Sequence, residues 1–175
     1  MSFDEIKQLW DKVDEPLFRV HFGKPHANVP DEETVAFLQE VGFPEAAEPG
    51  LDFTDLSDKL FTHSQLYTKD DFPALDEYLV IGSTSEGNPI CIDTKSGSIV
   101  YIDHDNGFEA VLINSSLVRF SHALALYQVA VRKESAVTMA DLRSLEERMQ
   151  RADAAGLEEN TFWRTELEKL EREVA

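Results

Sequence analysis

The stretch from Tyr78 to Ile113 constrains the fold more than any other part of the sequence. It contains four largely apolar runs, YLVIG, PICIDT, SIVYID and GFEAVLI, in which the pattern of side chains repeats at every second residue. This period is typical of β-strands. The runs are separated only by SEGN, by KSGS and by Asn106-Gly107, a dipeptide that favours a tight hairpin turn. Such short connections predict antiparallel neighbours, so that the stretch forms a meander.

The turns also predict how the strands pair. A two-residue turn at Ser96-Gly97 would place Cys91 opposite Ile102, and a tight turn after the third strand would place His104 opposite Glu109. Side chains alternate between the two faces of a sheet. The predicted first face contains Cys91, Asp93, Val100, Ile102 and His104, and the second contains Ile90, Ile92, Ile99, Tyr101 and Asp103.

Helical periodicity flanks the meander on both sides. Apolar residues recur three or four positions apart near residues 3–13, 31–41 and 115–131. Two more helices are predicted at about 138–155 and 160–174, where charges alternate in sign as on solvated helix faces. Asn114 or Ser115 is predicted to cap the third of these helices, and Gly156 to separate the last two. Residues 45–77 have no clear period, and LDF, KLF and QLY are candidates there for short strands. The order predicts an α+β fold, with helices packed on a central antiparallel sheet of about four strands and possible extra ones.

Length and composition suit a single globular domain over residues 1–175. Within it we expect an N-terminal helix and lead-in over 1–29 and C-terminal helices over 132–175. No apolar run approaches the roughly 18 residues of a membrane-spanning helix, and the start lacks the pattern of a signal peptide. The single cysteine excludes an internal disulfide. We therefore predict a cytoplasmic protein without a membrane partner.

Charge is the strongest compositional feature. The chain has 34 acidic and 16 basic residues and a net charge of −18, and residues 1–77 alone have 18 acidic and 6 basic residues. Such a field repels phosphate backbones, which argues against binding of nucleic acid. It attracts a basic protein and accelerates their association. Acidity that serves solubility alone is the alternative interpretation.

Thiol, imidazole and carboxylate groups lie close together in the meander, where they suggest a metal or acid–base site. The predicted register separates them, because Asp93 and Asp103 point to opposite faces and lie about 10 Å apart along the strands. A one-residue slip in either turn would change this. Cys91 is interpreted as a small buried apolar residue. No serine stands in a nucleophile elbow and no glycine-rich loop suits phosphate. The sequence thus predicts no catalytic residue, metal ligand or cofactor.

Two acidic pairs, Asp70-Asp71 and Asp76-Glu77, flank FPAL just before the first strand of the meander. The acidic residues at 31–33 suit the first turn of a helix, where its dipole favours negative charge. The two later pairs have no such structural explanation. We predict that Asp70, Asp71, Asp76 and Glu77 form an anionic edge for a basic partner, with plain solvated loops as the alternative.

Five segments occur in a characteristic order: FLQEVGFP, YLVIGS, GNPICIDTKSGSIVYIDHD, INSSLVRFSHALALY and EENTFWRTELEKL. Together they resemble the SUKH superfamily, and in particular its fourth immunity-protein family. The resemblance covers roughly residues 30–175, although 45–77 and 132–155 carry little of the pattern. It implies an α+β fold without catalysis. In that fold, Gly87 and Gly97 would serve turns, Asn114 a helix cap, and Leu117 and Phe120 the core.

The resemblance also implies a function. Family members are immunity proteins of bacterial polymorphic toxin systems, which bind and neutralise a cognate toxin domain, often a nuclease or a nucleic-acid deaminase. An acidic surface would suit the positive cleft of such a toxin. A non-catalytic regulatory or scaffold protein of the same fold is one alternative. A metal-dependent hydrolase built on Asp103, His104 and Asp105 is another, with less support. The sequence predicts no oligomeric state.

Overall fold

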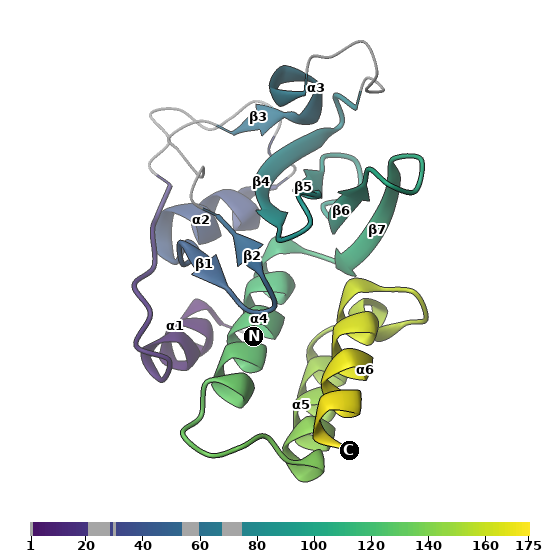
Figure 1. The fold of residues 1–175 in the computed structure, drawn as a ribbon. Helices are drawn as coiled ribbons and strands as arrows, with labels where there is room; N and C mark the ends of the chain where they lie inside the picture. The colour runs from purple at the N-terminus through teal and green to yellow at the C-terminus, as the bar shows by residue number, and fades with distance from the viewer. Residues whose placement is uncertain (1, 21–28, 30, 54–59, 68–74) are drawn as a thin grey trace.

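Figure 1 shows the computed structural model, which describes residues 2–20, 29, 31–53, 60–67 and 75–175. Along the chain its elements are α1 (Phe3–Asp11), α2 (Glu32–Glu40), β1 (Ala46–Ala47), β2 (Leu51–Asp52), β3 (Phe61–Thr62), α3 (His63–Leu66), β4 (Tyr78–Thr84), β5 (Pro89–Asp93), β6 (Ile99–Asp103), β7 (Glu109–Asn114), α4 (Leu117–Val131), α5 (Met139–Ala152), the 3-10 helix η1 (Ala154–Leu157) and α6 (Phe162–Val174). This order confirms the predicted α+β fold.

The strands pair in one antiparallel sheet with the order β1-β2-β4-β5-β6-β7, and β3 also pairs with β4. The predicted meander is confirmed as β4 to β7. Of the candidate short strands, LDF begins with β2 and KLF ends in β3, whereas QLY lies largely in α3. The prediction of a strand at QLY was therefore wrong, and β1 was not predicted.

The β5–β6 register differs from the prediction by two residues. Cys91 pairs with Val100 rather than with Ile102. The reason is a longer turn, in which the Asp93 carboxylate accepts a hydrogen bond from the backbone N–H of Lys95 at 2.9 Å and Gly97 adopts a φ of +76°. A shift of two residues leaves every side chain on the same face. The predicted faces of β5 and β6 are therefore retained.

The β6–β7 register differs by one residue, so the predicted pair of His104 and Glu109 was wrong. Asp103 lies opposite Glu109. The Asp103 carboxylate accepts hydrogen bonds from the N–H groups of Asp105 and Asn106, both at 3.1 Å, and Phe108 has a φ of +63°. These contacts lengthen the connection beyond the two-residue turn that the Asn-Gly dipeptide favours.

The two faces of the sheet bury different clusters. On the inner face, Ile90, Ile92 and Ile99 belong to the main core together with Phe37 of α2 and Phe120 of α4. On the outer face, Cys91, Val100 and Ile102 form a second cluster, with the partly buried Tyr78, Val80, Phe108 and Leu112 packed against it. Cys91 is fully buried, as predicted, and burial raises the pKa of its thiol.

Helices surround one end of this sheet (Figure 1). α1 and α5 pack against α4, α6 packs against α5, and both η1 and α6 contact β7. Trp10 of α1 and Trp163 of α6 are buried core residues. The two C-terminal helices therefore pack on the sheet edge and on α4. No helix in the described ranges is long and apolar enough to cross a membrane.

Candidate functional site

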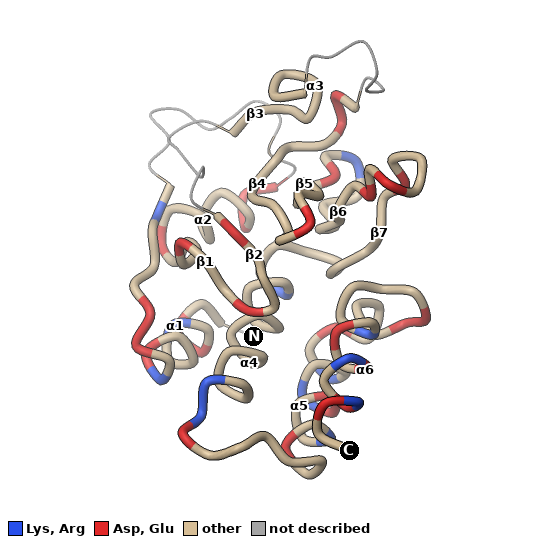
Figure 2. Tube along the Cα trace, viewed as in Figure 1, with Lys and Arg blue, Asp and Glu red and all other residues tan. Residues whose placement is uncertain are grey.

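Acidic residues far outnumber basic ones on the meander, in contrast to the C-terminal helices. From Leu75 to Asn114 the chain has seven acidic residues and one lysine, whereas from Leu117 to Ala175 it has eleven acidic and nine basic residues. Figure 2 shows this difference, with acidic positions at the strand ends of β4 to β7 and both signs of charge along α5 and α6. Unbalanced negative charge therefore distinguishes the meander from the C-terminal helices, and the meander shares it with residues 31–53, which have seven acidic residues and no basic one.

One end of the meander holds the described half of the predicted anionic edge. Asp76 is exposed and Glu77 is partly buried, just before β4. The Glu77 carbonyl accepts a hydrogen bond from the N–H of Thr94 at 2.9 Å, and its carboxylate lies 3.4 Å from Lys95 Nζ. Glu77 is thus held at the β5–β6 turn, with Asp76 next to it in sequence. Asp70 and Asp71 lie outside the described residues.

The first turn of α2 adds further carboxylates to this end. Asp31 caps the helix by accepting a hydrogen bond from the Thr34 N–H at 2.6 Å. A Cβ atom on Gly97 would lie only 3.8 Å from Asp31 Oδ2, so the cap lies beside the β5–β6 turn. We call six residues at this end the acidic edge: Asp31, Glu32, Glu33, Asp76, Glu77 and Asp93. The sequence predicted two of them as binding residues, and tertiary packing adds the others.

The opposite end of the strands contains a pocket of about 310 Å³, which we call the turn pocket. Its walls come from α3, from the β4–β5 turn with the start of β5, and from the end of β6 with the turn that follows. It is lined by His63, Tyr67, Glu86, Gly87, Pro89, Ile102, His104 and Phe108. Most of these side chains are apolar or aromatic. No sequence pattern indicates this pocket, because one of its walls is a helix from the segment without a clear period.

His104 is held in this wall by Asn88 instead of by the predicted partner Glu109. Asn88 is buried, and its Oδ1 accepts a hydrogen bond from the His104 N–H at 3.2 Å and also contacts the ring Nδ1. The ring Nε2 lies 3.5 Å from an Asp105 carboxylate oxygen. The imidazole therefore has a fixed orientation between an amide and a carboxylate.

A second hollow lies next to the turn pocket, and Glu86 lines both. This groove has a volume of about 450 Å³, and Tyr101, Phe162, Glu48 and Glu166 are among its walls. Burial, together with nearby carboxylates that include Glu86 and Glu166, raises the pKa of Tyr101. The β4–β5 turn thus stands between two hollows that both include carboxylates.

The carboxylates that suggested a metal or acid–base centre serve the turns. Asp93 caps the β5–β6 turn and Asp103 caps the β6–β7 turn, at opposite ends of the strands. Within the part of the chain that the structure describes, no three His, Cys, Asp or Glu side chains are grouped so that they could hold a metal ion. This arrangement gives no support to a hydrolase centre built on Asp103, His104 and Asp105.

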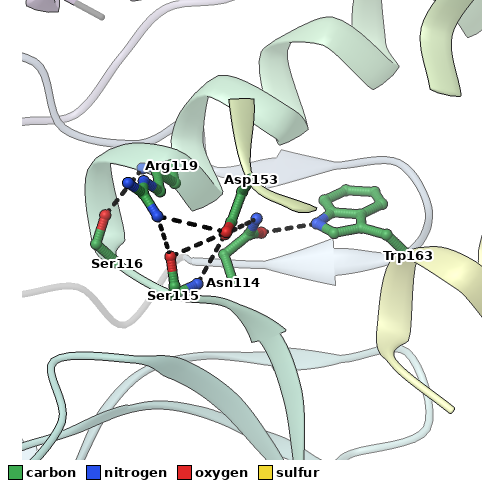
Figure 3. Close-up of polar contacts among 6 residues, drawn as sticks. All are labelled: Asn114, Ser115, Ser116, Arg119, Asp153 and Trp163. Carbon is green, nitrogen blue, oxygen red and sulfur yellow. Dashed lines mark hydrogen bonds and ion pairs between the residues drawn. The ribbon is translucent and has the colours of Figure 1, made fainter. Parts of the chain in front are cut away.

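A buried polar network joins the C-terminal helices to the end of the meander (Figure 3). Asp153, after α5, is 5% exposed. Its Oδ2 accepts hydrogen bonds from Asn114 Nδ2 at 2.9 Å and from the Ser115 N–H at 2.8 Å, and its Oδ1 accepts one from Ser115 Oγ at 2.9 Å. Arg119 Nη1 lies 3.5 Å from the same carboxylate and donates to Ser115 Oγ.

The network continues to α6. Trp163 Nε1 donates a hydrogen bond to Asn114 Oδ1 at 2.7 Å. A Cβ atom on Gly156 would lie 2.9 Å from Asn114 Nδ2, so the chain between α5 and α6 passes directly over this residue. Because the side chains of Asn114 and Ser115 bind Asp153, neither caps α4 as predicted. Ser116 is the cap. We interpret this Asp153 network as support for the meander rather than as a binding surface.

Comparison with models of known protein families shows to which family this chain belongs. The model of the SUKH-4 immunity protein family matches residues 25–169. The chain belongs to the SUKH-4 family. No curated protein and no solved structure shows significant similarity to it. The match confirms the predicted family, supports the role of an immunity protein and implies a cognate toxin as partner.

The matched range of this SUKH-4 protein includes the three main features of the candidate site. The acidic edge, the turn pocket and the Asp153 network all lie between residues 25 and 169. Immunity protein families are generally non-catalytic.

Proposed function

We propose that this SUKH-4 protein neutralises a basic toxin domain, of the nuclease or nucleic-acid deaminase class, by covering it with the acidic surface of the meander. The charge of the meander carries the proposal, because seven acidic residues and one lysine lie between Leu75 and Asn114. A protein that acts on nucleic acid needs a positive cleft for phosphates. An acidic surface complements such a cleft and accelerates association with it.

The acidic edge is the region to which we assign this steering role. Glu32, Glu33 and Asp76 are exposed. Within the described part of the chain, only Glu77 of the edge forms an ion pair, with Lys95, and such exposed pairs contribute little stability. The field of the edge is therefore largely available to a partner. Asp70 and Asp71 precede Asp76 in sequence, and the sequence-based prediction includes them in the same proposal.

The test is a measurement of association rate. The probe is the toxin domain encoded beside the gene of this protein, produced with an inactivating substitution in its own active site. The variant combines Asp70→Asn, Asp71→Asn, Asp76→Asn and Glu77→Gln. We expect association to slow by about tenfold at low salt and its dependence on salt to flatten.

A matched control changes the net charge equally on the C-terminal helices and the turn before α6. It combines Glu158→Gln, Glu159→Gln, Glu168→Gln and Glu171→Gln, all at exposed positions. Equal slowing by both variants would show that net charge, and not the edge, steers the encounter. A wild-type protein that neither binds this domain nor protects cells that express it would contradict the proposed function, and would favour a regulatory or scaffold role.

A further inference from the structure

We propose that the turn pocket is the anchor site of the complex, where the toxin inserts one apolar side chain that is flanked by a basic residue. This inference rests on the proposed function and names the contact surface for it. The pocket lies at the end of the strands opposite the acidic edge. Its shape, its chemistry and its charge each support this occupant.

The shape suits one large side chain. Pro89 and Ile102 are buried, and the partly buried rings of Tyr67 and Phe108 provide further walls. A volume of about 310 Å³ lies at the lower limit for pockets that bind small molecules. Pockets of apolar walls that receive an aromatic or aliphatic side chain are the usual hot spots of protein interfaces.

Phe108 provides a second, independent observation. Its φ of +63° is in the left-handed region, which is unfavourable for a bulky side chain. Glycine would avoid that strain at the same position. Phe108 instead packs on the outer cluster of Cys91, Val100 and Ile102 and lines the pocket. Strained residues of this kind concentrate at binding sites, where the side chain is needed in one place.

Charge at the pocket defines the flanking residue of the toxin. Glu86 lines the pocket, and Asp105 lies beside His104, another lining residue. The one lysine between Leu75 and Asn114 is Lys95, which lies at the other end of the strands and pairs with Glu77. A lysine or arginine next to the inserted side chain would therefore meet carboxylates. An apolar centre with a charged rim is the normal anatomy of a protein interface.

The pocket and the acidic edge can contact the same partner. Strands of five residues, such as β5 and β6, separate them by about 17 Å. A standard interface, which buries about 800 Å² on each partner, extends over more than that distance. The acidic edge and the turn pocket then have different roles. Exposed charge mainly sets the association rate, and a filled pocket mainly sets the dissociation rate.

The decisive experiment compares two glycine substitutions, Gly87→Asn and Gly107→Asn. Both glycines have a left-handed φ, of +83° and +68°, and no atom lies within 4 Å of a Cβ built on either. Asparagine tolerates this conformation, so both variants should fold. Gly87 lines the turn pocket, and Gly107 is on the neighbouring turn outside the lining. With the inactivated toxin domain as probe, we expect Gly87→Asn to raise the dissociation rate by about tenfold or more and Gly107→Asn by less than about twofold.

A second pair on α3 and just after it repeats the test without changing a turn. Tyr67 lines the pocket, whereas its neighbour Leu66 is 48% exposed and does not. We expect Tyr67→Ala to weaken the affinity by about tenfold and Leu66→Ala to leave it nearly unchanged. Circular dichroism of all four variants confirms that they are folded.

The outcomes separate the two proposals. If the wild-type protein does not bind the toxin domain, both the proposed function and this inference are wrong. If it binds, and Gly87→Asn and Tyr67→Ala bind equally well, the turn pocket is not the anchor site but the proposed function stands. If Gly87→Asn instead converts a wild-type dimer into a monomer, as seen by light scattering, the pocket holds a second copy of this chain and the inference is overturned.

Discussion

The C-terminal helices and the meander of this protein use charge in opposite ways. On the helices, charged residues meet within the chain, as Arg164 meets Glu146 at 2.7 Å and Lys169 meets Glu166 at 2.6 Å. On the meander, acidic residues outnumber lysine seven to one. The difference shows that paired or buried charge belongs to the scaffold of this fold, whereas exposed and unbalanced charge marks the surface that we assign to a partner.

The meander even carries a local electrostatic cost. Asp103 and Glu109 lie directly opposite each other on β6 and β7. Like charges in this position destabilise a sheet. The Asp153 network shows the contrary arrangement, because there every hydrogen bond made by the carboxylate also secures a helix or the end of a strand. Three substitutions test this contrast, in order of decreasing effect on stability.

The largest effect is expected for Asp153→Ala, in the scaffold. This change removes the acceptor of three hydrogen bonds and leaves Asn114 Nδ2 and the Ser115 N–H without their partner. We expect the free energy of unfolding to fall by about 3 kcal/mol, because bonds to a charged group are strong and orphaned donors are costly. Urea denaturation measures the change. Glu159→Ala, at an exposed site before α6, is the control and should stay within about 0.5 kcal/mol.

An intermediate effect is expected for Gly156→Ala. The added methyl group would lie 2.8 Å from the Ile113 carbonyl oxygen and 2.9 Å from Asn114 Nδ2, so the loop before α6 must move. Overpacking of this kind costs about 1–3 kcal/mol. Thermal or urea denaturation gives the value, with Ala154→Ser at the neighbouring exposed position as control. A neutral Gly156→Ala would mean that the C-terminal helices are not held closely against β7.

The smallest effect, and one of opposite sign, is expected for Glu109→Lys on the meander. It replaces the repulsion across from Asp103 with an attraction, so stability should rise by about 0.2–1 kcal/mol. Glu109→Gln, which removes the repulsion without adding an attraction, should give a smaller gain. If Glu109→Lys lowers stability, the like-charge pair is not a cost, and the contrast between the two regions weakens. Denaturation at low and high salt separates the electrostatic part of the change.

The sequence pattern correctly predicted the features that depend only on residues close together in the chain. The four strands of the meander and the faces of β5 and β6 follow from a period of two, which a shift of two residues cannot alter. Both registers were wrong, because the carboxylates of Asp93 and Asp103 bind backbone N–H groups inside the turns and lengthen them. Turn composition alone does not reveal such contacts.

Features that depend on distant parts of the chain were not predictable from spacing. Asp153 lies nearly forty positions from Asn114 and Ser115 in the sequence, yet it accepts hydrogen bonds from both. No local pattern indicates this partner, so the sequence did not show that these two residues are unavailable to cap α4. The acidic edge was predicted only at Asp76 and Glu77 among the described residues, since α2 reaches the same turn through tertiary packing. The turn pocket depends on α3, whose segment has no readable period.

The Asp153 network holds the chain where β7 ends, far from the turns at the other end of the strands. Those turns are held by contacts within and between themselves, as when the His104 N–H donates a hydrogen bond to Asn88 Oδ1, and these contacts do not include Asp153. The surface that we assign to the partner at these turns can therefore change in sequence without loss of the contacts that hold the C-terminal helices to β7.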